Sequence, residues 1–291
     1  MKKQTKRRLK VSAAVVAAAG AVAIAVALML IVPHRTVPVL MYHGFTEDES
    51  ATSTLVIELE DFERQMTYLA DNHFNVISAS GLADYLANGK ELPPKTIVLT
   101  FDDGYKSFFD LAYPVLQKHG FPATAYLFID GLARPDDLDR AKGISAEGLV
   151  EIGSHGVTHR MLPLLDPDEI AWELVSSKQQ LEAEFGVPVE TFCYPAGAIT
   201  EAIVTATAAA GYTAAVATAY QRGQFPRGNR YIQRRVLVSP VAGCPRVFRI
   251  MTSGYYVPAR ELTLKILGIR VPRDLYRKIE HHEQASADIH R

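Results

Sequence analysis

Two carboxylates stand side by side in this chain, at Asp102 and Asp103, directly after the apolar run VLTF. Neighbouring anions repel each other unless a positive charge holds them. Side chains on a strand alternate between its faces, so a continued strand would point the two carboxylates in different directions. Gly104 follows them and is typical of a turn. The pair is therefore either a solvated turn at the end of a strand or part of a cation-binding site.

Two histidines, His155 and His159, lie four residues apart in the stretch GSHGVTH. In a helical turn this spacing places both rings on one face, about 6 Å apart, which is close enough to share a metal ion. A catalytic zinc-type site uses three protein ligands and keeps one position open for water. The aspartate pair can supply the third ligand and leave its other carboxylate free to act as a base. A histidine pair at this spacing also occurs in proteins without a metal, so the motif alone leaves both interpretations open.

These residues must be positioned by elements that bring distant parts of the chain together. From Thr36 onward, short apolar runs alternate with segments whose apolar residues recur at helical spacing. This alternation predicts an α/β fold with a parallel sheet and helices packed outside it. The expected strands are residues 37–42, 74–78, 96–101, 123–129, 149–152, 191–194, 214–217 and 235–238, and the expected helices are residues 59–72, 79–88, 105–119, 169–185 and 201–210. Residues 46–55 are expected to form a polar loop.

Polar residues follow four of the expected strands at the point where each strand ends. They are Tyr42-His43, Asp102-Asp103, Ser154-His155 and Tyr194-Pro195. In a parallel α/β barrel, the catalytic residues lie at the carboxyl ends of the strands. The coincidence favours a functional site over a solvated turn.

Charge and cysteine content exclude several classes of protein. The net charge of the 291 residues is −1, and the first ten residues hold six basic residues and no acidic one, so the rest carries −7. A mildly acidic body does not indicate a nucleic-acid partner. Two cysteines, Cys193 and Cys244, are too few for a disulfide framework or a cysteine-rich zinc site. They either pair in an oxidising compartment or are two buried thiols.

The N-terminus predicts the location of the protein. Residues 1–10 are expected to form a basic cytoplasmic segment and residues 11–33 a transmembrane signal anchor, because Val11 to Val32 carries no charge over 22 residues. Basic residues before the span stay in the cytoplasm, which places everything after Pro33 outside the membrane. Ala25-Val26-Ala27 resembles a cleavage site, so a cleaved signal peptide and a secreted protein is the alternative.

At these motifs the chain resembles the polysaccharide deacetylases of carbohydrate esterase family 4, which share the NodB homology domain. The motifs are Thr100–Tyr105 (TFDDGY), His155–His159 (HGVTH) and Tyr194–Gly197 (YPAG), and the resemblance extends from about residue 37 to 238. It implies a distorted (β/α) barrel of the NodB type over residues 36–259, followed by a C-terminal tail at residues 260–291.

The resemblance also implies a role for each motif residue. Asp103, His155 and His159 are expected to bind a divalent metal, Asp102 to be the catalytic base, and the backbone N–H of Tyr194 to hold the oxyanion. Many members place a histidine acid late in the chain. This sequence has no histidine between His159 and His281.

The expected strand at residues 37–42 is followed by a histidine, His43. In this the chain resembles the circularly permuted branch that acts on poly-β-1,6-N-acetylglucosamine, in which the early strand supplies the acid. His43 is therefore expected to be the general acid. The alternative is a histidine satisfied in the core. The sequence departs from the family pattern at Ala196, where an aromatic residue is usual, and at Arg160, where a small residue is frequent. The third motif also lacks an arginine to orient the base, and Arg235 is the expected substitute.

The implied function is metal-dependent removal of N-acetyl groups from an extracellular or cell-wall polysaccharide that contains N-acetylglucosamine. Two alternatives stay open: an O-acetyl esterase on the same fold, and a catalytically decayed, membrane-anchored glycan-binding protein. The expected cofactor is Zn²⁺, while Co²⁺, Ni²⁺ or Mn²⁺ also suit an Asp-His-His site. The expected partners are the acetylated polysaccharide and, through the N-terminal helix, the membrane.

Overall fold

The computed structural model of the chain describes residues 35–48, 53–133, 135–218 and 229–266, together with Val16, Gly20 and Val26. Apart from those three residues, the expected membrane helix at residues 11–33 lies outside the described part, as do the basic segment 1–10 and residues 267–291. No helix within the described ranges is long and apolar enough to cross a bilayer.

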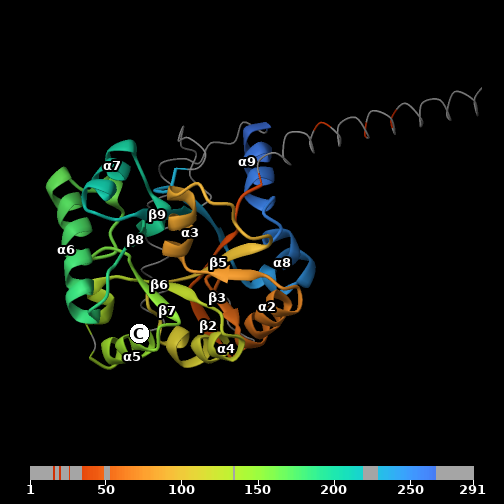
Figure 1. The fold of residues 1–291 in the computed structure, drawn as a ribbon, viewed down its shortest axis with the longest axis horizontal. Helices are drawn as coiled ribbons and strands as arrows, with labels where there is room; N and C mark the ends of the chain where they lie inside the picture. The colour runs from red at the N-terminus through yellow and green to blue at the C-terminus, as the bar shows by residue number, and fades with distance from the viewer. Residues whose placement is uncertain are drawn as a thin grey trace, which may run out of the picture.

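Seven parallel strands of the described part close into a barrel with helices around it (Figure 1). The ring closes because β1 pairs on one edge with β5, at Leu40 opposite Leu99, and on the other edge with β10, at Leu40 opposite Val236. In ring order the strands are β1 (Val39–Tyr42), β5 (Thr96–Asp102), β6 (Ala123–Leu127), β7 (Val150–Ser154), β8 (Thr191–Cys193), β9 (Ala214–Thr218) and β10 (Gln233–Leu237). The expected parallel sheet is confirmed and is closed rather than open.

Three short strands lie outside the ring. Strand β4 (Asn75–Ile77) pairs with the first half of β5, on the edge that β6 uses further along. Strands β2 (Gly44–Thr46) and β3 (Val56–Glu58) form a separate parallel pair next to the site end of β1.

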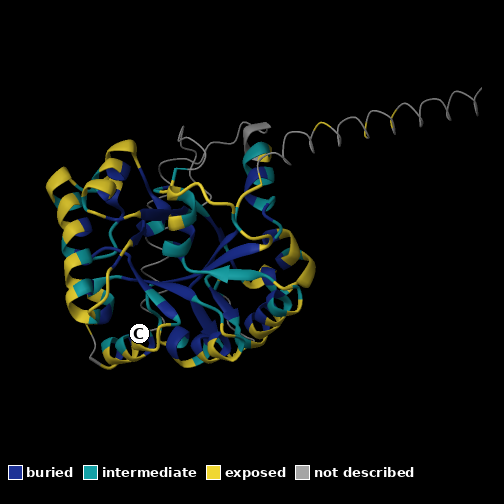
Figure 2. Cartoon of the chain, in the orientation of Figure 1, coloured by how far each residue is buried: buried dark blue, intermediate teal, exposed yellow. Residues whose placement is uncertain are grey.

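The two faces of each barrel strand contact different apolar clusters. The inward cluster contains Val39, Val98, Tyr126, Cys193 and Val216, whereas the larger outer cluster packs beneath the helices. Figure 2 shows most strand residues as buried and the outer sides of the helices as exposed. Because side chains on a strand alternate, residues two and four positions after an inward-facing residue also point into the barrel.

Helix α3 (Ala79–Ala87) closes the amino-terminal end of the barrel. Ala79 and Leu82 belong to the inward cluster, and the backbone N–H of Ala79 donates a 2.9 Å hydrogen bond to Thr124 at the start of β6. The carboxylate of Glu151 accepts from the backbone N–H of Ser80 in the first turn of α3, where an anion is favourable. Within the described residues, the opposite end of the barrel, at the carboxyl ends of the strands, is not covered by this helix and can hold a site.

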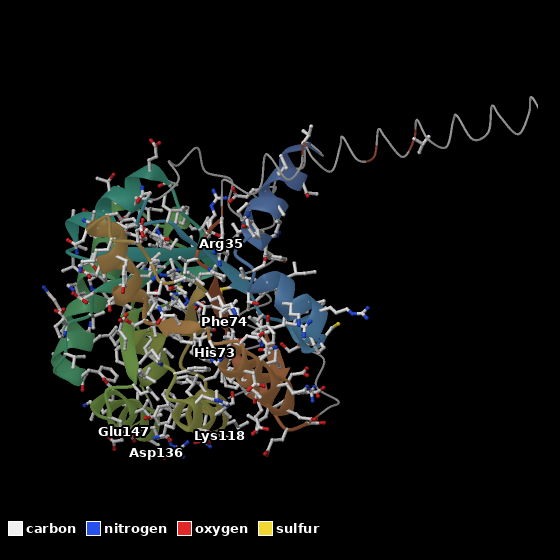
Figure 3. All side chains as sticks on the ribbon, turned by 45° about the vertical axis from the view of Figure 1, so that its right-hand side comes forward. Arg35, His73, Phe74, Lys118, Asp136 and Glu147 are labelled. Carbon is white, nitrogen blue, oxygen red and sulfur yellow. The ribbon has the colours of Figure 1, made fainter. Side chains whose placement is uncertain are left out.

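The outer layer consists of helices that cover the barrel wall. They are α2 (Leu59–Asp71), the π-helical turn η2 (Phe108–Ala112) leading into α4 (Tyr113–His119), α5 (Pro135–Ala146), α6 (Pro167–Phe185), α7 (Glu201–Ala209), α8 (Pro245–Met251) and α9 (Tyr256–Ile266). Short 3₁₀ turns are η3 (Ile129–Leu132), η4 (Leu162–Leu164), η5 (Pro195–Gly197) and η6 (Pro240–Gly243). Neighbouring helices are joined by polar contacts: Tyr113 and Gln117 of α4 donate bonds of 2.7 and 2.6 Å to Glu147, which follows α5 and is labelled in Figure 3.

Most expected elements are confirmed, with their ends shifted by one or two residues. The sequence analysis missed β2 and β3, which have three residues each, and it missed α5, whose charged sequence is interrupted by Gly143. It also missed α8 and α9. The expected tail boundary at residue 260 falls inside α9, which an Arg234–Glu261 ion pair ties to β10.

Candidate active site

Side chains from four strands of the ring meet at the carboxyl end of the barrel. Asp102 is the last residue of β5, His43 follows β1, and His155 follows β7. The Nε2 atoms of His43 and His155 lie 3.9 and 4.0 Å from the same oxygen, Oδ2 of Asp102. Arg235 reaches the same carboxylate from β10. Residues almost 200 positions apart in the chain therefore share one site.

The carboxylate of Asp102 is held by a two-pronged bond to Arg235. Nη1 donates to Oδ1 at 2.6 Å and Nη2 to Oδ2 at 2.7 Å. Both side chains are almost fully buried, at 2% and 1% exposure. Arg235 Nη1 also donates to Thr100 Oγ1 at 3.1 Å, and that hydroxyl donates to Leu40 O at 2.7 Å. Val98, Thr100 and Asp102 alternate with outward residues on β5, so the strand period itself points Asp102 into the barrel.

Burial and charge act in opposite directions on Asp102. Burial raises the pKa of the carboxyl, but the Arg235 guanidinium, with smaller contributions from His155 and His43, holds the pKa below its ordinary value. A buried ion pair with this geometry keeps the carboxylate ionised where an isolated one would be protonated. The Asp102 carboxyl is therefore ionised inside the barrel and is chemically able to accept a proton.

Asp103 leaves the strand in the left-handed conformation, with φ at 70°, and Gly104 continues the turn with φ at 67°. Only a few per cent of non-glycine residues adopt this conformation, and aspartate is among the most tolerant. The turn breaks the alternation and brings Oδ1 of Asp103 to 3.6 Å from His155 Nε2 and 3.3 Å from His159 Nε2. Both carboxylates therefore face one site, although a continued strand would have separated them.

The histidine pair does not sit in a helical turn, so that part of the sequence prediction is wrong. Residues 155–160 form a loop in which Gly156 has φ at 90° and His159 has φ at 61°. The loop brings the two Nε2 atoms within 3.2 Å of each other. His155 Nδ1 lies 2.7 Å from the carbonyl oxygen of Cys193. An Nδ1–H donated to this carbonyl leaves Nε2 with its lone pair directed into the site, which is the tautomer a metal requires.

The residues present fit a divalent metal. Ligand atoms of Asp103, His155 and His159 lie within 4.8 Å of one another. Oδ1 of Asp103 is buried and accepts no hydrogen bond within the described part of the chain, as is expected for an oxygen that coordinates an ion. Burial raises the pKa of Asp103, but His159 and the other imidazoles lower it far more, so the carboxyl is ionised.

A second possible ligand group, formed by Asp102, His155 and Cys193, fits a metal less well. Nη2 of Arg235 donates to Cys193 Sγ at 2.9 Å, so a cation already occupies this side of the site. Burial also raises the pKa of the Cys193 thiol well above its ordinary value, which disfavours the thiolate that binds metals. Of the two groups, Asp103, His155 and His159 therefore fit a divalent metal better.

The metal-free protein is expected to lose stability in mild acid because of His155. Burial, aided by the neighbouring His159, lowers its pKa to about 4 from an ordinary value of 6.5. The unfolded state then binds more protons than the folded state between these pH values, so the free energy of unfolding rises with pH up to about 6.5 and falls as pH drops toward 4. Denaturant melts in the presence of a chelator at pH 4.5, 5.5 and 7 measure this slope. The variant His155→Gln should flatten it, and an unchanged slope would contradict the assignment.

His43 lies at the wall of the site with 6% exposure. Its Nε2 faces Asp102, and its Nδ1 is buried without a hydrogen-bond partner among the described residues. Tyr42, the residue before it, points to the outer cluster instead, where its hydroxyl donates to Gln65 at 2.9 Å. The histidine is therefore not satisfied by the core, which was the alternative interpretation of this residue.

The backbone N–H of Tyr194 does not face the site. It donates a 3.1 Å bond to the carbonyl oxygen of Val216 in β9, so the sequence prediction of an oxyanion donor at Tyr194 is wrong. The Tyr194 side chain is also turned away, since its hydroxyl donates to Tyr231 O at 3.1 Å. Pro195 has no N–H, and Ala196 follows with φ at 52° and an N–H that donates no hydrogen bond to another described residue. Ala196 thus offers the first unengaged amide after β8.

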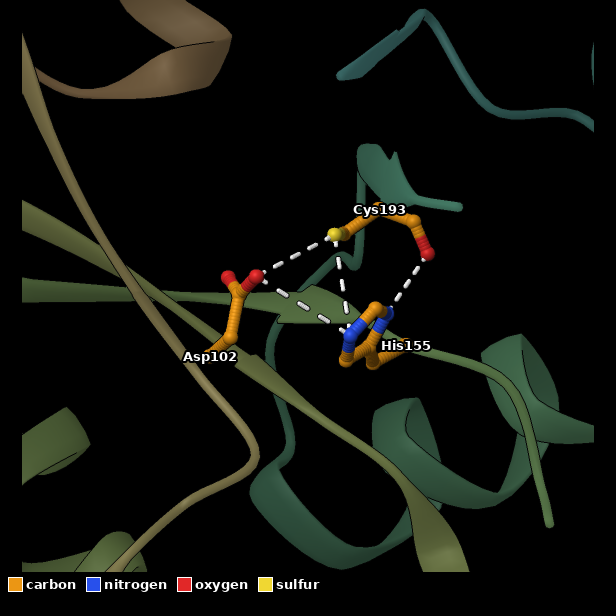
Figure 4. Close-up of side chains that lie close together, drawn as sticks. All are labelled: Asp102, His155 and Cys193. Carbon is orange, nitrogen blue, oxygen red and sulfur yellow. Dashed lines mark hydrogen bonds and ion pairs between the residues drawn. The ribbon is translucent and has the colours of Figure 1, made fainter. Parts of the chain in front are cut away.

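Cys193 is the functional neighbour that the sequence analysis missed. Its Sγ lies 3.7 Å from both Asp102 Oδ2 and His155 Nε2 (Figure 4). The two cysteines of the chain are not paired, because Cys193 is buried and Cys244 is exposed. The position of Cys193 in the expected strand 191–194, directly before the YPAG motif, was the signal that could have placed it in the site.

Comparisons with known proteins identify the family to which the chain belongs. A family model described as polysaccharide deacetylase matches residues 89–215. YxkH of Bacillus subtilis, assigned to the polysaccharide deacetylases, is 30% identical over 206 residues, which cover 70% of this chain and 72% of YxkH.

Two further relatives extend the match. The poly-β-1,6-N-acetyl-D-glucosamine N-deacetylase of Staphylococcus aureus is 24% identical over 199 residues, covering 63% of this chain and 68% of that protein. The crystal structure of BC0361, a polysaccharide deacetylase from Bacillus cereus, is 29% identical with a TM-score of 0.61 and covers 73% of this chain and 68% of that one. The chain belongs to the polysaccharide deacetylase family, the NodB-homology group of carbohydrate esterase family 4.

Proposed function

We propose that this protein is a metal-dependent N-deacetylase of an N-acetylglucosamine polymer. The observation that carries the proposal is that the neighbouring carboxylates of Asp102 and Asp103 lie in the same site but contact different partners. Asp102 is bound to Arg235, while Asp103 faces the two histidines. Adjacent carboxylates with different surroundings are suited to different roles.

Asp103, His155 and His159 would hold the ion, and the side on which His159 and Asp103 are 20% and 15% exposed would admit water and substrate. A divalent ion at such a site polarises a carbonyl oxygen and lowers the pKa of a bound water from about 15.7 toward 7. Within this arrangement Asp102 takes the proton from the attacking water. Arg235 orients the Asp102 carboxylate and keeps it ionised.

His43 would donate a proton to the departing amine. Its Nε2 is 3.9 Å from Oδ2 of Asp102. An amide nitrogen must be protonated before it can leave at neutral pH. The N–H of Ala196 is our candidate for the hydrogen bond to the oxyanion, in place of that of Tyr194. A backbone donor in this role contributes about 3–4 kcal/mol to lowering the barrier.

The substrate proposal draws on the relative whose name states it, the Staphylococcus aureus poly-β-1,6-N-acetyl-D-glucosamine N-deacetylase. Zinc is our proposed metal, because two imidazoles and one carboxylate form a common zinc ligand set. We also propose that residues 11–33 anchor the catalytic domain on the outer side of the membrane. That part of the proposal depends on the sequence pattern alone.

Removal of the metal should abolish deacetylation. A chelator should reduce acetate release from an N-acetylglucosamine oligomer to background, and adding Zn²⁺ or Co²⁺ should restore it, because the water nucleophile depends on the ion. The measurement is acetate release from matched N-acetylated and O-acetylated glycans, with Asp103→Ala as the variant that cannot be restored.

Each outcome of this assay separates one alternative. Release from the O-acetylated glycan alone would replace the proposal with an O-acetyl esterase. Binding of the glycan without any acetate release would favour a decayed binding protein. Activity that persists after complete metal removal would contradict metal dependence.

A further inference from the structure

The loop that carries both histidines donates hydrogen bonds to one buried carboxylate, that of Glu173 on helix α6. Its Oε2 accepts bonds from the backbone N–H groups of Val157 at 2.6 Å and Thr158 at 3.1 Å. Its Oε1 accepts from the Thr158 hydroxyl. Glu173 is only 1% exposed. A charged side chain is almost never this buried without dedicated partners, and these three hydrogen bonds all come from residues between the two histidines.

Gly156 is shaped by the same carboxylate. A Cβ at this position would lie 2.9 Å from Oε2 of Glu173, in addition to the strain imposed by φ at 90°. The backbone of the loop therefore approaches Glu173 as closely as it can. On its other side the loop is tied to η3, where Ile129 and Asp130 donate backbone N–H bonds to the carbonyls of Gly156 and Val157 at 3.2 and 2.9 Å.

Arg160 completes the attachment of the loop to α6 and accounts for its departure from the family pattern. Its Nε donates to Thr158 Oγ1 at 3.1 Å and lies 3.8 Å from Glu173 Oε1. Its Nη1 donates to Glu169 Oε1 at 3.1 Å, one turn earlier on α6. The Arg160 guanidinium thus lies between the Glu169 and Glu173 carboxylates and offsets their negative charge.

Helix α6 is itself fixed in place at this end. Asp166 caps its first turn, and Glu169 reaches back to the Asp166 N–H in a reciprocal capping box. Ser177, one turn after Glu173, lies 2.8 Å from Ser154 at the end of β7. The side chains at positions 173 and 177 therefore set the register of α6 against the residues on both sides of His155.

We propose that Glu173 is a positioning residue for the metal site: it fixes the loop between His155 and His159 so that both Nε2 atoms face Asp103. The reason is geometric, because His159 has a left-handed backbone and does not belong to a helix or strand that would hold it. The inference rests on the proposed metal site. It assigns to α6, a helix that contributes no ligand, control over the affinity of that site.

The test is metal binding by Glu173→Gln, measured by titrating the metal-free protein with Co²⁺ and following visible absorption. The glutamine keeps the size of the side chain but has one accepting oxygen instead of two, so it cannot accept from both backbone N–H groups and from the Thr158 hydroxyl as the carboxylate does. Loss of such a supporting contact typically weakens metal affinity about 10–100-fold. We expect a shift of this size, with a changed Co²⁺ spectrum that reports altered ligand geometry.

Glu182→Gln provides the matched control. Glu182 lies on the same helix and also accepts a backbone N–H, that of Val189 at 3.0 Å, but it does so at the far end of α6. This variant should bind Co²⁺ like the wild type. Equal affinities for Glu173→Gln and wild type would overturn the inference, and so would equal losses in the two variants, because the effect would then be a general one of helix stability.

Thr158→Val serves as the second variant if Glu173→Gln does not fold. It removes one donor to Glu173 and leaves both backbone bonds, so we expect a several-fold weaker Co²⁺ affinity, and wild-type affinity would contradict the inference. If the proposed metal site itself is wrong, the wild type will bind no Co²⁺, whereas failure of the inference about Glu173 leaves Co²⁺ binding by the wild type intact.

Discussion

Asp102→Asn should lower kcat for acetate release by about 10²–10⁴-fold, the usual contribution of a general base, while the protein still binds its metal. Asparagine has nearly the same shape and can still accept one bond from Arg235, but it cannot take a proton from water. The ligand atoms of Asp103, His155 and His159 are not altered. Steady-state kinetics and metal content of the same preparation measure the two effects together.

The matched control is Asp110→Asn. Asp110 is also an aspartate bound to a guanidinium, that of Arg140 at 2.6 Å, but this pair lies on the outer layer with 36% and 40% exposure. It should retain wild-type kcat. If Asp102→Asn kept more than about a tenth of wild-type activity, Asp102 would not be the base. If it lost its metal as well, the division of roles between the two carboxylates would be wrong.

Arg235→Met should destabilise the protein by about 3–5 kcal/mol, because it leaves the Asp102 carboxylate buried without its cation. It should also shift the pH dependence of kcat/KM. Arg235 lowers the pKa of Asp102, so its loss raises that pKa, and the base becomes protonated at a higher pH. Activity should therefore fall off at higher pH on the acidic side of the profile. Denaturant unfolding and a pH–rate profile measure the two effects.

A double variant separates the ion pair from simple loss of packing. Asp102→Asn combined with Arg235→Met should be destabilised by clearly less than the sum of the single changes, because groups in contact are coupled. Arg140→Met, which breaks the exposed pair with Asp110, should cost only about 0–1 kcal/mol. Additive effects at Asp102 and Arg235 would show that the pair does not act as a unit.

The residue types, their order and the strand periods were readable in the sequence. Short apolar runs that alternate along the chain with helical segments predicted the parallel sheet. Polar residues directly after four of the strands predicted which end of the sheet holds the site. The direction of Asp102 also follows from local sequence, since Val98, Thr100 and Asp102 share the inward face of β5. Such features depend on a few neighbouring residues, and local pattern is sufficient to reveal them.

Other features depended on backbone conformations that the motifs do not determine. A helical turn was expected for the histidine pair, but Gly156 and His159 adopt left-handed conformations and form a loop. The N–H of Tyr194 was expected in the site, but pairing of β8 with β9 uses it. In both cases a tertiary hydrogen bond or turn overrides the local spacing.

What only the tertiary structure decided is which distant side chains become partners. The sequence offered Arg235 as a cation for the base, but 133 residues separate it from Asp102, and only closure of the barrel brings β10 and β5 to the two edges of β1. Glu173 carries no motif at all, and its role emerges because α6 packs against the end of β7. Long-range pairing is set by how the whole ring closes and how each helix packs on it, and no short stretch of sequence contains that information.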